Sequence, residues 1–397
     1  MRTTRLLSIL FVLTWAAAGS GGDSIGDVRS LYDGKLRPDI QVNTFRHIDR
    51  LFPTRTIKRG TSVLPLPPSP APLTDISFSS NGKKWDLADY LSANRVSGLL
   101  ILKDGKVVLE DYELGNTPND RWVSWSMAKS ICSTLAAAAL KDGYISSLDD
   151  PLTKYMPELR GTSYEGTSVR NVLQMASGVK WDETYTDPKS DRRHMLELQI
   201  AQKPGEIVKF MSGLPRVGAP GTVWNYSTGE THMIGALLHA AVKKPVAEYL
   251  SEKIWSKAGM EDDATWWLES PDGLEVGGSG LSARLRDYGR FALFVLNGGK
   301  IGEEQVVPPG WFEEAGSSKV IGGKPVDYGY MWWTFGEKAA PVHQGAFRAT
   351  GIFGQGIYLN PREHVAIVLW SAHSKPSGPS AVNDNDFFAA VTNALHR

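Results

Sequence analysis

Apolar and polar residues alternate with two different periods along the chain, and the change of period marks where strands give way to helices. Residues 96–114 (VSGLLILKDGKVVLEDYEL) form two strand-like runs on either side of Asp104-Gly105, a dipeptide that favours a tight hairpin turn. The run that follows Ser126 is rich in alanine and leucine and stops near Gly143, as expected of a helix with a glycine just past its end. These patterns predict a hairpin followed by an apolar helix.

The remaining patterns place helices in the middle of the chain and strands near both ends. Residues 150–276 carry helical patterns broken by loops, strand patterns return at 356–361 and 364–370, and a helical pattern closes the chain over 381–397. This order predicts an α+β fold: an antiparallel β-sheet flanked by helices and built from both ends of the chain, with a mostly helical second lobe.

The first residues have the pattern of a secretory signal. Arg2 and Arg5 precede an apolar run over 6–15, and three alanines at 16–18 supply small residues for cleavage. The run is too short to span a bilayer as a mature helix. We therefore expect residues 1–18 to be a signal peptide and the mature protein to be secreted or periplasmic, without stable membrane insertion. An uncleaved anchor is the alternative.

Residues 19–75 are predicted to be an N-terminal extension that ends in a proline-rich linker or wrapping segment over 53–75. The main domain is predicted over 76–397, with its helical lobe at about 150–276. A chain of 397 residues with 42% apolar composition is long enough to bury a large core.

Composition and charge argue against several classes of partner. Lysine and arginine together number 43, as do aspartate and glutamate, so the net charge of zero gives no sign of nucleic-acid binding. Cys132 is the only cysteine, so an intramolecular disulfide is impossible. The histidines show no His-Glu-x-x-His spacing and no phosphate-binding glycine loop is present, so we expect neither a metal nor an organic cofactor.

Ser126 and Lys129 lie one turn apart at the start of the predicted apolar helix, so their side chains would share a face. A neutral lysine can accept the serine proton and so create a nucleophile. A free lysine is protonated at neutral pH, with a pKa of about 10.4, so burial must lower that pKa. Trp122 and Trp125 could supply the burial. Ser126 and Lys129 are therefore the candidate nucleophile and base.

Two similar motifs have the wrong context for catalysis. Ser80-x-x-Lys83 encloses an Asn-Gly pair, which is turn chemistry, so the two side chains would not share a helical face. The Gly-x-Ser-x-Gly at 22–26 follows directly on the predicted signal, whereas a nucleophile elbow needs a strand before it and a helix after it.

The segments around and after Ser126 resemble the serine β-lactamase-like superfamily, which includes class C β-lactamases, D-Ala-D-Ala peptidases, related carboxylesterases and 6-aminohexanoate-dimer hydrolases. The resemblance spans about residues 76–397 and is closest to the 6-aminohexanoate-dimer hydrolase and carboxylesterase branch. It implies the β-lactamase/transpeptidase-like fold. Five segments carry it in the family's order: 124–162 (SWSMAKSICSTLAAAALKDGYISSLDDPLTKYMPELRGT), 169–191 (VRNVLQMASGVKWDETYTDPKSD), 220–238 (PGTVWNYSTGETHMIGALL), 277–291 (GGSGLSARLRDYGRF) and 349–361 (ATGIFGQGIYLNP).

The resemblance implies further roles in the site. The family's second motif is Tyr-x-Asn, so Tyr226 would relay protons to the leaving group, while Thr228 replaces the asparagine. In the segment WDETYTDP, Tyr185 would lie on a loop over the cleft and touch substrate, with a purely structural loop tyrosine as the alternative.

The third motif of the family, usually Lys-Thr-Gly or His-x-Gly, lies on a strand that edges the cleft. We place it at Ala349-Thr350-Gly351, where these residues would bind substrate; His343-Gln344-Gly345 is the rival placement. With the first placement, the N–H of Ile352 would join that of Ser126 as the oxyanion hole.

The sequence thus predicts an exported serine hydrolase that cleaves a small carboxylic ester or linear amide through an acyl-enzyme. Ser126 would attack, Lys129 would act as base, and Tyr226 would shuttle the proton. The alternatives are a β-lactamase or D-Ala-D-Ala carboxypeptidase with the same chemistry, and a non-catalytic ligand-binding relative. Ala349 and Thr228 lack the cation and the amide of the β-lactam branches, so we expect esters to be preferred.

Overall fold

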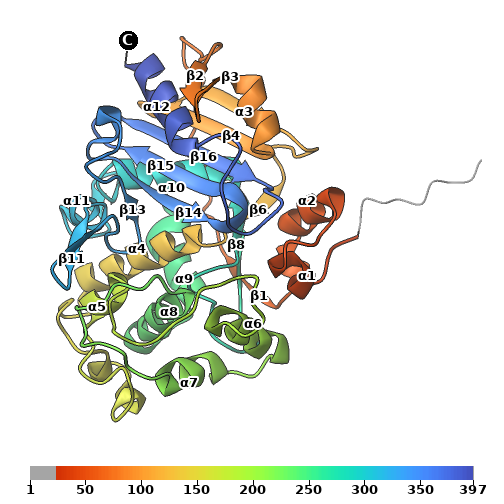
Figure 1. Ribbon diagram of the computed structural model, residues 1–397. Helices are drawn as coiled ribbons and strands as arrows, with labels where there is room; N and C mark the ends of the chain where they lie inside the picture. Colours follow the sequence, from red (N-terminus) through yellow and green to blue (C-terminus); the bar gives the residue numbers. More distant parts are fainter. Residues whose placement is uncertain (1–23, 397) are drawn as a thin grey trace, which may run out of the picture.

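The computed structural model describes residues 24–396, so the predicted signal peptide at 1–18 and part of the Gly-x-Ser-x-Gly at 22–26 lie outside the described residues. The largest sheet has six antiparallel strands in the order β13-β14-β15-β16-β4-β5 (Figure 1). Its strands are β4 (Val96–Lys103), β5 (Lys106–Tyr112), β13 (Trp333–Thr334), β14 (Phe347–Gly351), β15 (Gln355–Asn360) and β16 (Val365–Ser371). Because β16 pairs with β4, the two ends of the chain meet in one sheet, which confirms the predicted architecture.

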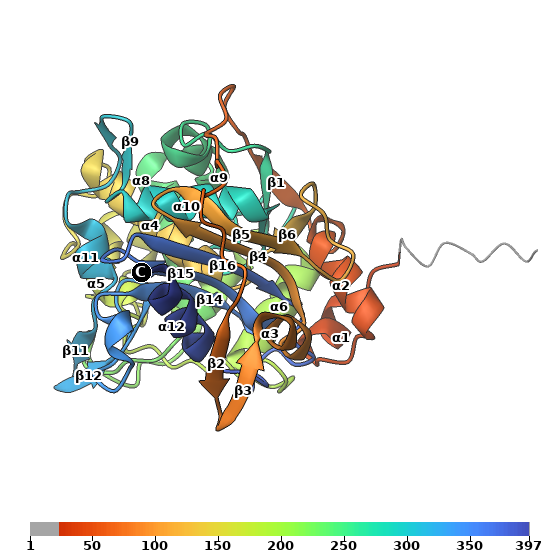
Figure 2. The same ribbon diagram turned by 90° about the horizontal axis from the view of Figure 1, so that it is seen from above.

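Helices cover both faces of this sheet (Figures 1 and 2). One face packs against α4 (Met127–Lys141) and α10 (Leu285–Leu296), and the other against α3 (Leu87–Ala93) and α12 (Asp384–Leu395). A small hairpin of β2 (Ser77–Ser80) and β3 (Lys83–Asp86) lies beside α3 and α12.

Strand β4 is buried on both faces, which explains why its sequence is an unbroken apolar run rather than an alternating one. Leu100 and Leu102 belong to the core that contains α4 and α10, whereas Leu99 and Ile101 belong to the core that contains α12. Successive side chains of a strand point to opposite faces, so a strand covered on both sides is apolar throughout. The predicted tight turn between β4 and β5 is formed by Asp104-Gly105, both with positive φ.

The middle of the chain forms the predicted helical lobe, which lies below the sheet in Figure 1. Its elements are the short η2 (Leu152–Lys154) and η3 (Pro157–Leu159), then α5 (Val169–Leu173), α6 (Asp191–Ala201), α7 (Glu206–Gly213), α8 (Thr228–Val242), α9 (Val246–Leu250) and the π-helical turn η4 (Ser251–Trp255). Helix α8 packs along α4, so the two lobes share one hydrophobic core.

A second, four-stranded antiparallel sheet joins the start of the chain to its middle, in the order β1-β7-β8-β6. Its strands are β1 (Thr54–Ile57), β6 (Arg121–Val123), β7 (Ala264–Trp267) and β8 (Leu281–Arg284). Strand β6 ends just before Ser126 and therefore anchors the chain that leads into α4.

The N-terminal extension before residue 76 packs against the main domain. Helices α1 (Val28–Tyr32) and α2 (Pro38–Arg46) bury apolar side chains, Tyr32 and Phe45 among them, in the main core, and β1 pairs with β7. The proline-rich segment then wraps the body, since the Leu64 amide donates to the Gly259 carbonyl. Apolar burial and strand pairing hold the extension in place.

The remaining elements are short and lie mainly in the last third of the chain. They are η1 (Ile48–Arg50), β9 (Lys300–Ile301), β10 (Glu304–Gln305), α11 (Trp311–Ala315), β11 (Lys319–Ile321), β12 (Lys324–Val326), η5 (Pro341–His343) and η6 (Ile352–Gly354). Within residues 24–396, none of the helices combines the length and apolar character that crossing a membrane requires.

Candidate active site

Ser126 lies at the N-terminus of α4, on a turn with an unusual backbone. Trp125, the residue before it, has a φ of +44°, a left-handed conformation that is uncommon for a bulky residue. Such conformations persist only where the surroundings fix them, and they often occur at functional sites. Here the Trp125 ring is fully buried and makes edge contacts with Tyr32, Phe45 and Trp267, at centroid distances of 5.9, 5.4 and 5.8 Å.

Strand β14 approaches this turn closely because Gly351 has no side chain. A Cβ at position 351 would lie 2.6 Å from the Ser124 carbonyl oxygen and 3.0 Å from the Trp125 Cβ. The first distance is too short for a Cβ without a backbone shift and the second is tight, so glycine allows the end of β14 to lie directly beside the serine turn.

Lys129 is buried beneath Ser126, with 1% of its surface exposed. Its Nζ lies 2.9 Å from Ser126 Oγ, 2.9 Å from Thr228 Oγ1 and 2.9 Å from the Gly278 carbonyl oxygen. Burial lowers the pKa of Lys129 to about 7, while the nearby carboxylate of Glu183 acts in the opposite direction. At neutral pH a large fraction of the amine can therefore accept a proton from Ser126.

Tyr226 is the third of the predicted catalytic residues, after Ser126 and Lys129. Its ring centroid lies 5.1 Å from Lys129 Nζ, and its hydroxyl interacts with Ser126. Burial raises the pKa of Tyr226, and the Glu183 carboxylate raises it further. Tyr226 therefore stays a neutral phenol at physiological pH, which suits it to passing a proton on and leaves Lys129 as the base.

Two residues that the sequence analysis did not assign to catalysis complete the surroundings of Lys129. Thr228, recognised only as a departure from the family pattern, contacts both Lys129 and Glu183 through its hydroxyl. Glu183 accepts hydrogen bonds from the Thr228 amide at 2.8 Å, from the Thr228 hydroxyl and from the indole N–H of Trp181. The only signal for Glu183 in the sequence was its place two residues before Tyr185.

The amides predicted for the oxyanion hole are free to bind a ligand. Within residues 24–396, neither the Ser126 N–H nor the Ile352 N–H has a hydrogen-bond acceptor. Both residues line the same cavity, Ser126 from the start of α4 and Ile352 from the end of β14. Two unpaired amides beside a nucleophile provide the donors that a developing oxyanion needs.

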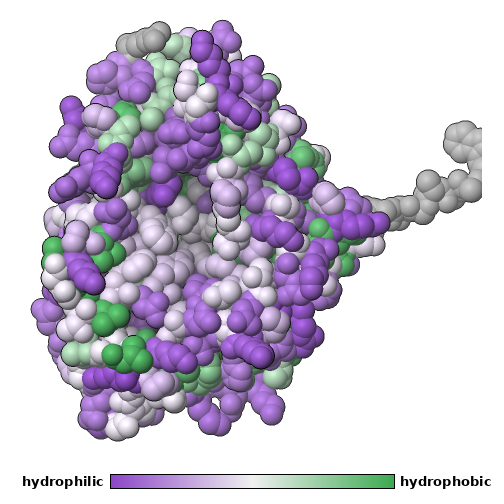
Figure 3. Space-filling view, in the orientation of Figure 1, coloured by the Kyte–Doolittle hydropathy of each residue, from purple (hydrophilic) through white to green (hydrophobic). Residues whose placement is uncertain are grey.

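The cavity around Ser126 has a volume of about 590 Å³ and a mostly neutral polar and aromatic lining. In Figure 3 the molecule is hollowed between the sheet and the helical lobe, and the residues there are mostly pale. Among the described residues that line the cavity, Glu183 carries the only formal charge and no lysine or arginine is present. The lining consists of Ser126, Glu183, Thr184, Tyr185, Thr186, Tyr226, Trp333, Thr350, Gly351, Ile352, Pro376, Ser377 and Gly378.

The other predicted residues are not all brought to this cavity. Tyr185, Thr350 and Gly351 line it, but the Ala349 side chain is buried in the core and does not line the cavity. His343, from the rival placement of the third motif, is buried between the Tyr358 hydroxyl at 3.0 Å and the Asn385 carbonyl at 3.1 Å. The geometry therefore favours the placement at 349–351.

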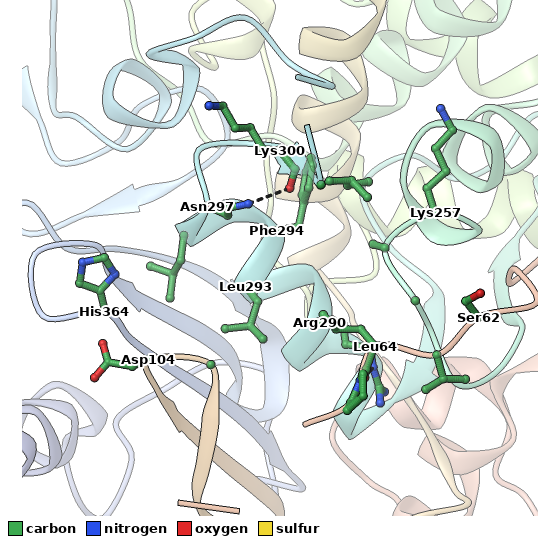
Figure 4. A pocket seen from close by; sticks show the side chains of 18 residues that line it. Ser62, Leu64, Asp104, Lys257, Arg290, Leu293, Phe294, Asn297, Lys300 and His364 are labelled. Atoms are coloured by element: carbon green, nitrogen blue, oxygen red, sulfur yellow. Dashed lines mark hydrogen bonds between the residues drawn. The ribbon is translucent and has the colours of Figure 1, made fainter. Parts of the chain in front are cut away.

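Neither a second motif nor a second cavity offers the same chemistry. Ser80 and Lys83 lie on the two strands of the β2–β3 hairpin and not on a helix, as predicted, and Ser80 is buried whereas Lys83 is exposed. A larger cavity of about 680 Å³ lies between the proline-rich segment and α10 (Figure 4). Its lining includes Arg290, which pairs with Asp287 and Glu261, and Lys257, which pairs with Glu304. Among residues 24–396 no cluster of three or more potential ligands is arranged to hold a metal ion.

Comparisons with known proteins show which family and fold the chain resembles. Residues 88–390 match the family model described as Beta-lactamase. The chain is 28% identical over 351 residues to the 6-aminohexanoate-dimer hydrolase of Paenarthrobacter ureafaciens, covering 84% of this chain and 85% of the relative. A solved structure from Bacillus anthracis that carries the 6-aminohexanoate-dimer hydrolase name has a TM-score of 0.77 at 22% identity, covering 91% and 93% of the two chains. A family VIII carboxylesterase shares the fold with a TM-score of 0.60 at 14% identity, covering 78% and 94%.

Proposed function

The chain belongs to the Beta-lactamase family of serine hydrolases, and from this premise we propose that it hydrolyses neutral carboxylic esters or linear amides through an acyl-enzyme on Ser126. The observation that carries the proposal is the buried Lys129, whose Nζ lies 2.9 Å from the Ser126 hydroxyl and whose pKa burial lowers to about 7. A lysine in this state can take the serine proton at neutral pH.

In the acylation step, Ser126 Oγ attacks the carbonyl carbon of the substrate while its proton passes to Lys129 Nζ. The carbonyl oxygen becomes an oxyanion that accepts hydrogen bonds from the amides of Ser126 and Ile352. Tyr226 takes the proton from Lys129 and gives its own to the leaving alcohol or amine as the bond to the carbonyl carbon breaks. The proximity of the Tyr226 ring to Lys129 Nζ, 5.1 Å, supports this relay.

In the deacylation step, a water molecule attacks the acyl carbon and its proton passes to the same base. Ser126 Oγ leaves and recovers its proton, and the carboxylic acid is released. Every proton in this cycle moves among Ser126, Lys129, Tyr226, the substrate and the attacking water.

The charge of the cavity supports a neutral substrate. Glu183 is the only formally charged side chain among the described residues that line the cavity, so a substrate carboxylate would meet a negative field without a cation to pair with. A charge-assisted hydrogen bond contributes roughly 1.5–3 kcal/mol, so its loss costs roughly ten- to hundred-fold in kcat/KM for carboxylate-bearing β-lactams. Esters without a carboxylate lose nothing.

A hydrolysis screen tests the proposal. The purified protein is offered short p-nitrophenyl esters, linear 6-aminohexanoate amides, nitrocefin and benzylpenicillin, with the Ser126→Ala variant as control. We expect ester turnover to exceed nitrocefin turnover by about 100-fold or more, an estimate based on the missing charge-assisted contact. Efficient hydrolysis of benzylpenicillin would favour the β-lactamase alternative, and equal rates for wild type and Ser126→Ala would rule out the assigned nucleophile.

We also propose that the protein is exported. The basic residues Arg2 and Arg5, the apolar run and the small residues up to Ala18 support a cleaved signal. Intact-mass measurement of the protein from a secreting host should show a chain that lacks about the first 18 residues. A full-length chain recovered from the cytoplasm would contradict export.

A further inference from the structure

The three polar neighbours of Lys129 limit how a neutral lysine can be oriented. Ser126 Oγ, Thr228 Oγ1 and the Gly278 carbonyl oxygen each lie 2.9 Å from Nζ. A neutral amine has two N–H groups and one lone pair, so it can donate to only two of these neighbours. The third must donate to the amine, and catalysis requires that the third be Ser126.

The Gly278 carbonyl cannot be that donor, because it carries no proton. Gly278 approaches so closely because it has no side chain: a Cβ at this position would lie 3.2 Å from Lys129 Nζ. The choice of donor is therefore between two hydroxyls, those of Ser126 and Thr228.

Glu183 determines which of the two hydroxyls donates to Lys129. The Thr228 hydroxyl has one proton, and it hydrogen-bonds to Glu183 Oε1. Thr228 is the donor in this bond and the carboxylate oxygen is the acceptor, so the Thr228 proton points to Glu183 and away from Lys129. Thr228 must then accept a hydrogen bond from Lys129, and the lone pair of the amine is left for Ser126.

Glu183 is itself held in this orientation. Its Oε2 accepts hydrogen bonds from the Thr228 amide at 2.8 Å and from the indole N–H of Trp181, and both of these groups can only donate. The carboxylate lies at the N-terminus of α8, where backbone N–H groups and the helix dipole favour negative charge.

We propose that Glu183 is a positioning residue that acts through the Thr228 hydroxyl to aim the lone pair of Lys129 at the Ser126 hydroxyl. This inference rests on the proposed function, because it assigns no role to Glu183 unless Lys129 is the base. It treats Thr228 as part of the hydrogen-bond chain that directs the base.

The charge of Glu183 gives the inference a second measurable consequence. The carboxylate opposes the effect of burial and raises the pKa of Lys129. Replacing Glu183 with glutamine removes this charge, so the pKa of Lys129 must fall further and the rising limb of kcat/KM must move to lower pH. A loss of folded protein would instead reduce the rate equally at every pH.

Three variants test the hydrogen-bond chain, with kcat/KM for a neutral p-nitrophenyl ester measured across pH. Thr228→Val keeps the shape of the side chain without the hydroxyl and should lower the plateau by at least about tenfold, whereas Thr228→Ser keeps the hydroxyl and should stay within about threefold of wild type. Glu183→Gln places an amide N–H₂ near the Thr228 hydroxyl, which lets threonine donate to Lys129. We expect a lower plateau and a rising limb at lower pH.

A matched control is Glu206→Gln on α7, which removes a carboxylate that pairs with Lys209 at the protein surface and should leave the profile unchanged. Equal plateaus for Thr228→Val and Thr228→Ser would overturn the inference, as would a Glu183→Gln profile that coincides with wild type. The Thr228 pair keeps the test valid even if Glu183→Gln does not fold. Activity retained in Ser126→Ala would contradict the proposed function itself, whereas an inactive Ser126→Ala beside wild-type-like Glu183 and Thr228 variants would refute only the role of Glu183.

Discussion

Replacing Lys129 with methionine should make the protein less active but also change how its stability depends on pH. Burial lowers the pKa of Lys129 from 10.5 to about 7, so the folded protein resists binding a proton that the unfolded chain binds readily. Between these two values the unfolded state holds more protons than the folded state, and the free energy of unfolding must rise with pH. Lys129 therefore lowers the free energy of unfolding. This penalty is present in full below pH 7 and is absent above pH 10.5.

The size of the effect follows from the two pKa values. Their difference corresponds to about 5 kcal/mol between the protonated and neutral forms. Integrated over the accessible range, the contribution of Lys129 to the free energy of unfolding should rise by about 2 kcal/mol between pH 7 and pH 9. The hydrogen bonds that methionine cannot make, to Ser126, Thr228 and Gly278, change the absolute stability of the variant but not this slope.

Urea denaturation followed by tryptophan fluorescence at pH 7, 8 and 9 measures this slope. Wild type should gain about 2 kcal/mol relative to Lys129→Met over the range, since the other titrating groups are common to both proteins. The control is Lys209→Met, which removes a lysine side chain that is 76% exposed. Its free energy of unfolding should change with pH in parallel with that of wild type. Parallel curves for wild type and Lys129→Met would show that Lys129 is not held neutral by burial, and the proposed base would lose its physical support.

Three further predictions concern catalysis and the extension. The kcat/KM of wild type for a neutral ester should rise with an apparent pKa of about 7 that belongs to the Lys129 and Tyr226 pair, and a rate still rising at about pH 10 would count against it. Ser126→Ala combined with Lys129→Ala should be no less active than either single variant, because the two residues act as one unit; loss of ester turnover in Ser80→Ala would point to the wrong serine. Phe45→Ala should lower the free energy of unfolding by about 3–5 kcal/mol in urea, because this fully buried ring packs against the tryptophan that precedes Ser126; a change below about 1 kcal/mol would mean that the extension is only loosely attached.

The parts of the fold that could be predicted are those with a local cause. The hairpin turn at Asp104-Gly105 and the helix after Ser126 follow from turn chemistry and from apolar periodicity, and both are present. The predicted boundary at residue 76 rested on the polar and proline-rich composition of 53–75, which does not reveal how closely the extension packs on the main domain. Tyr32 and Phe45 pack against Trp125, which lies more than 75 residues later in the chain, and no local sequence pattern predicts such a contact.

The site shows the same division between local and distant causes. Ser126 and Lys129 share a helical turn, so their contact could be predicted from spacing. Glu183 contacts Thr228 across 45 residues of chain, and no local pattern of residues pairs the two. Ala349 was placed in the cavity by the spacing of the motif, but its side chain is buried in the core, and only the last two residues of the motif, Thr350 and Gly351, line the cavity.

The central claim is that Ser126 carries the acyl group, and trapping that group tests it most directly. The protein is treated with a fluorophosphonate, or mixed with a p-nitrophenyl ester and quenched in acid, then digested and mapped by mass spectrometry. We predict one adduct on the peptide that contains Ser126, absent in Ser126→Ala and strongly reduced in Lys129→Met. An adduct on Ser80 or another residue, or rapid ester hydrolysis with no covalent adduct under either treatment, would contradict the account.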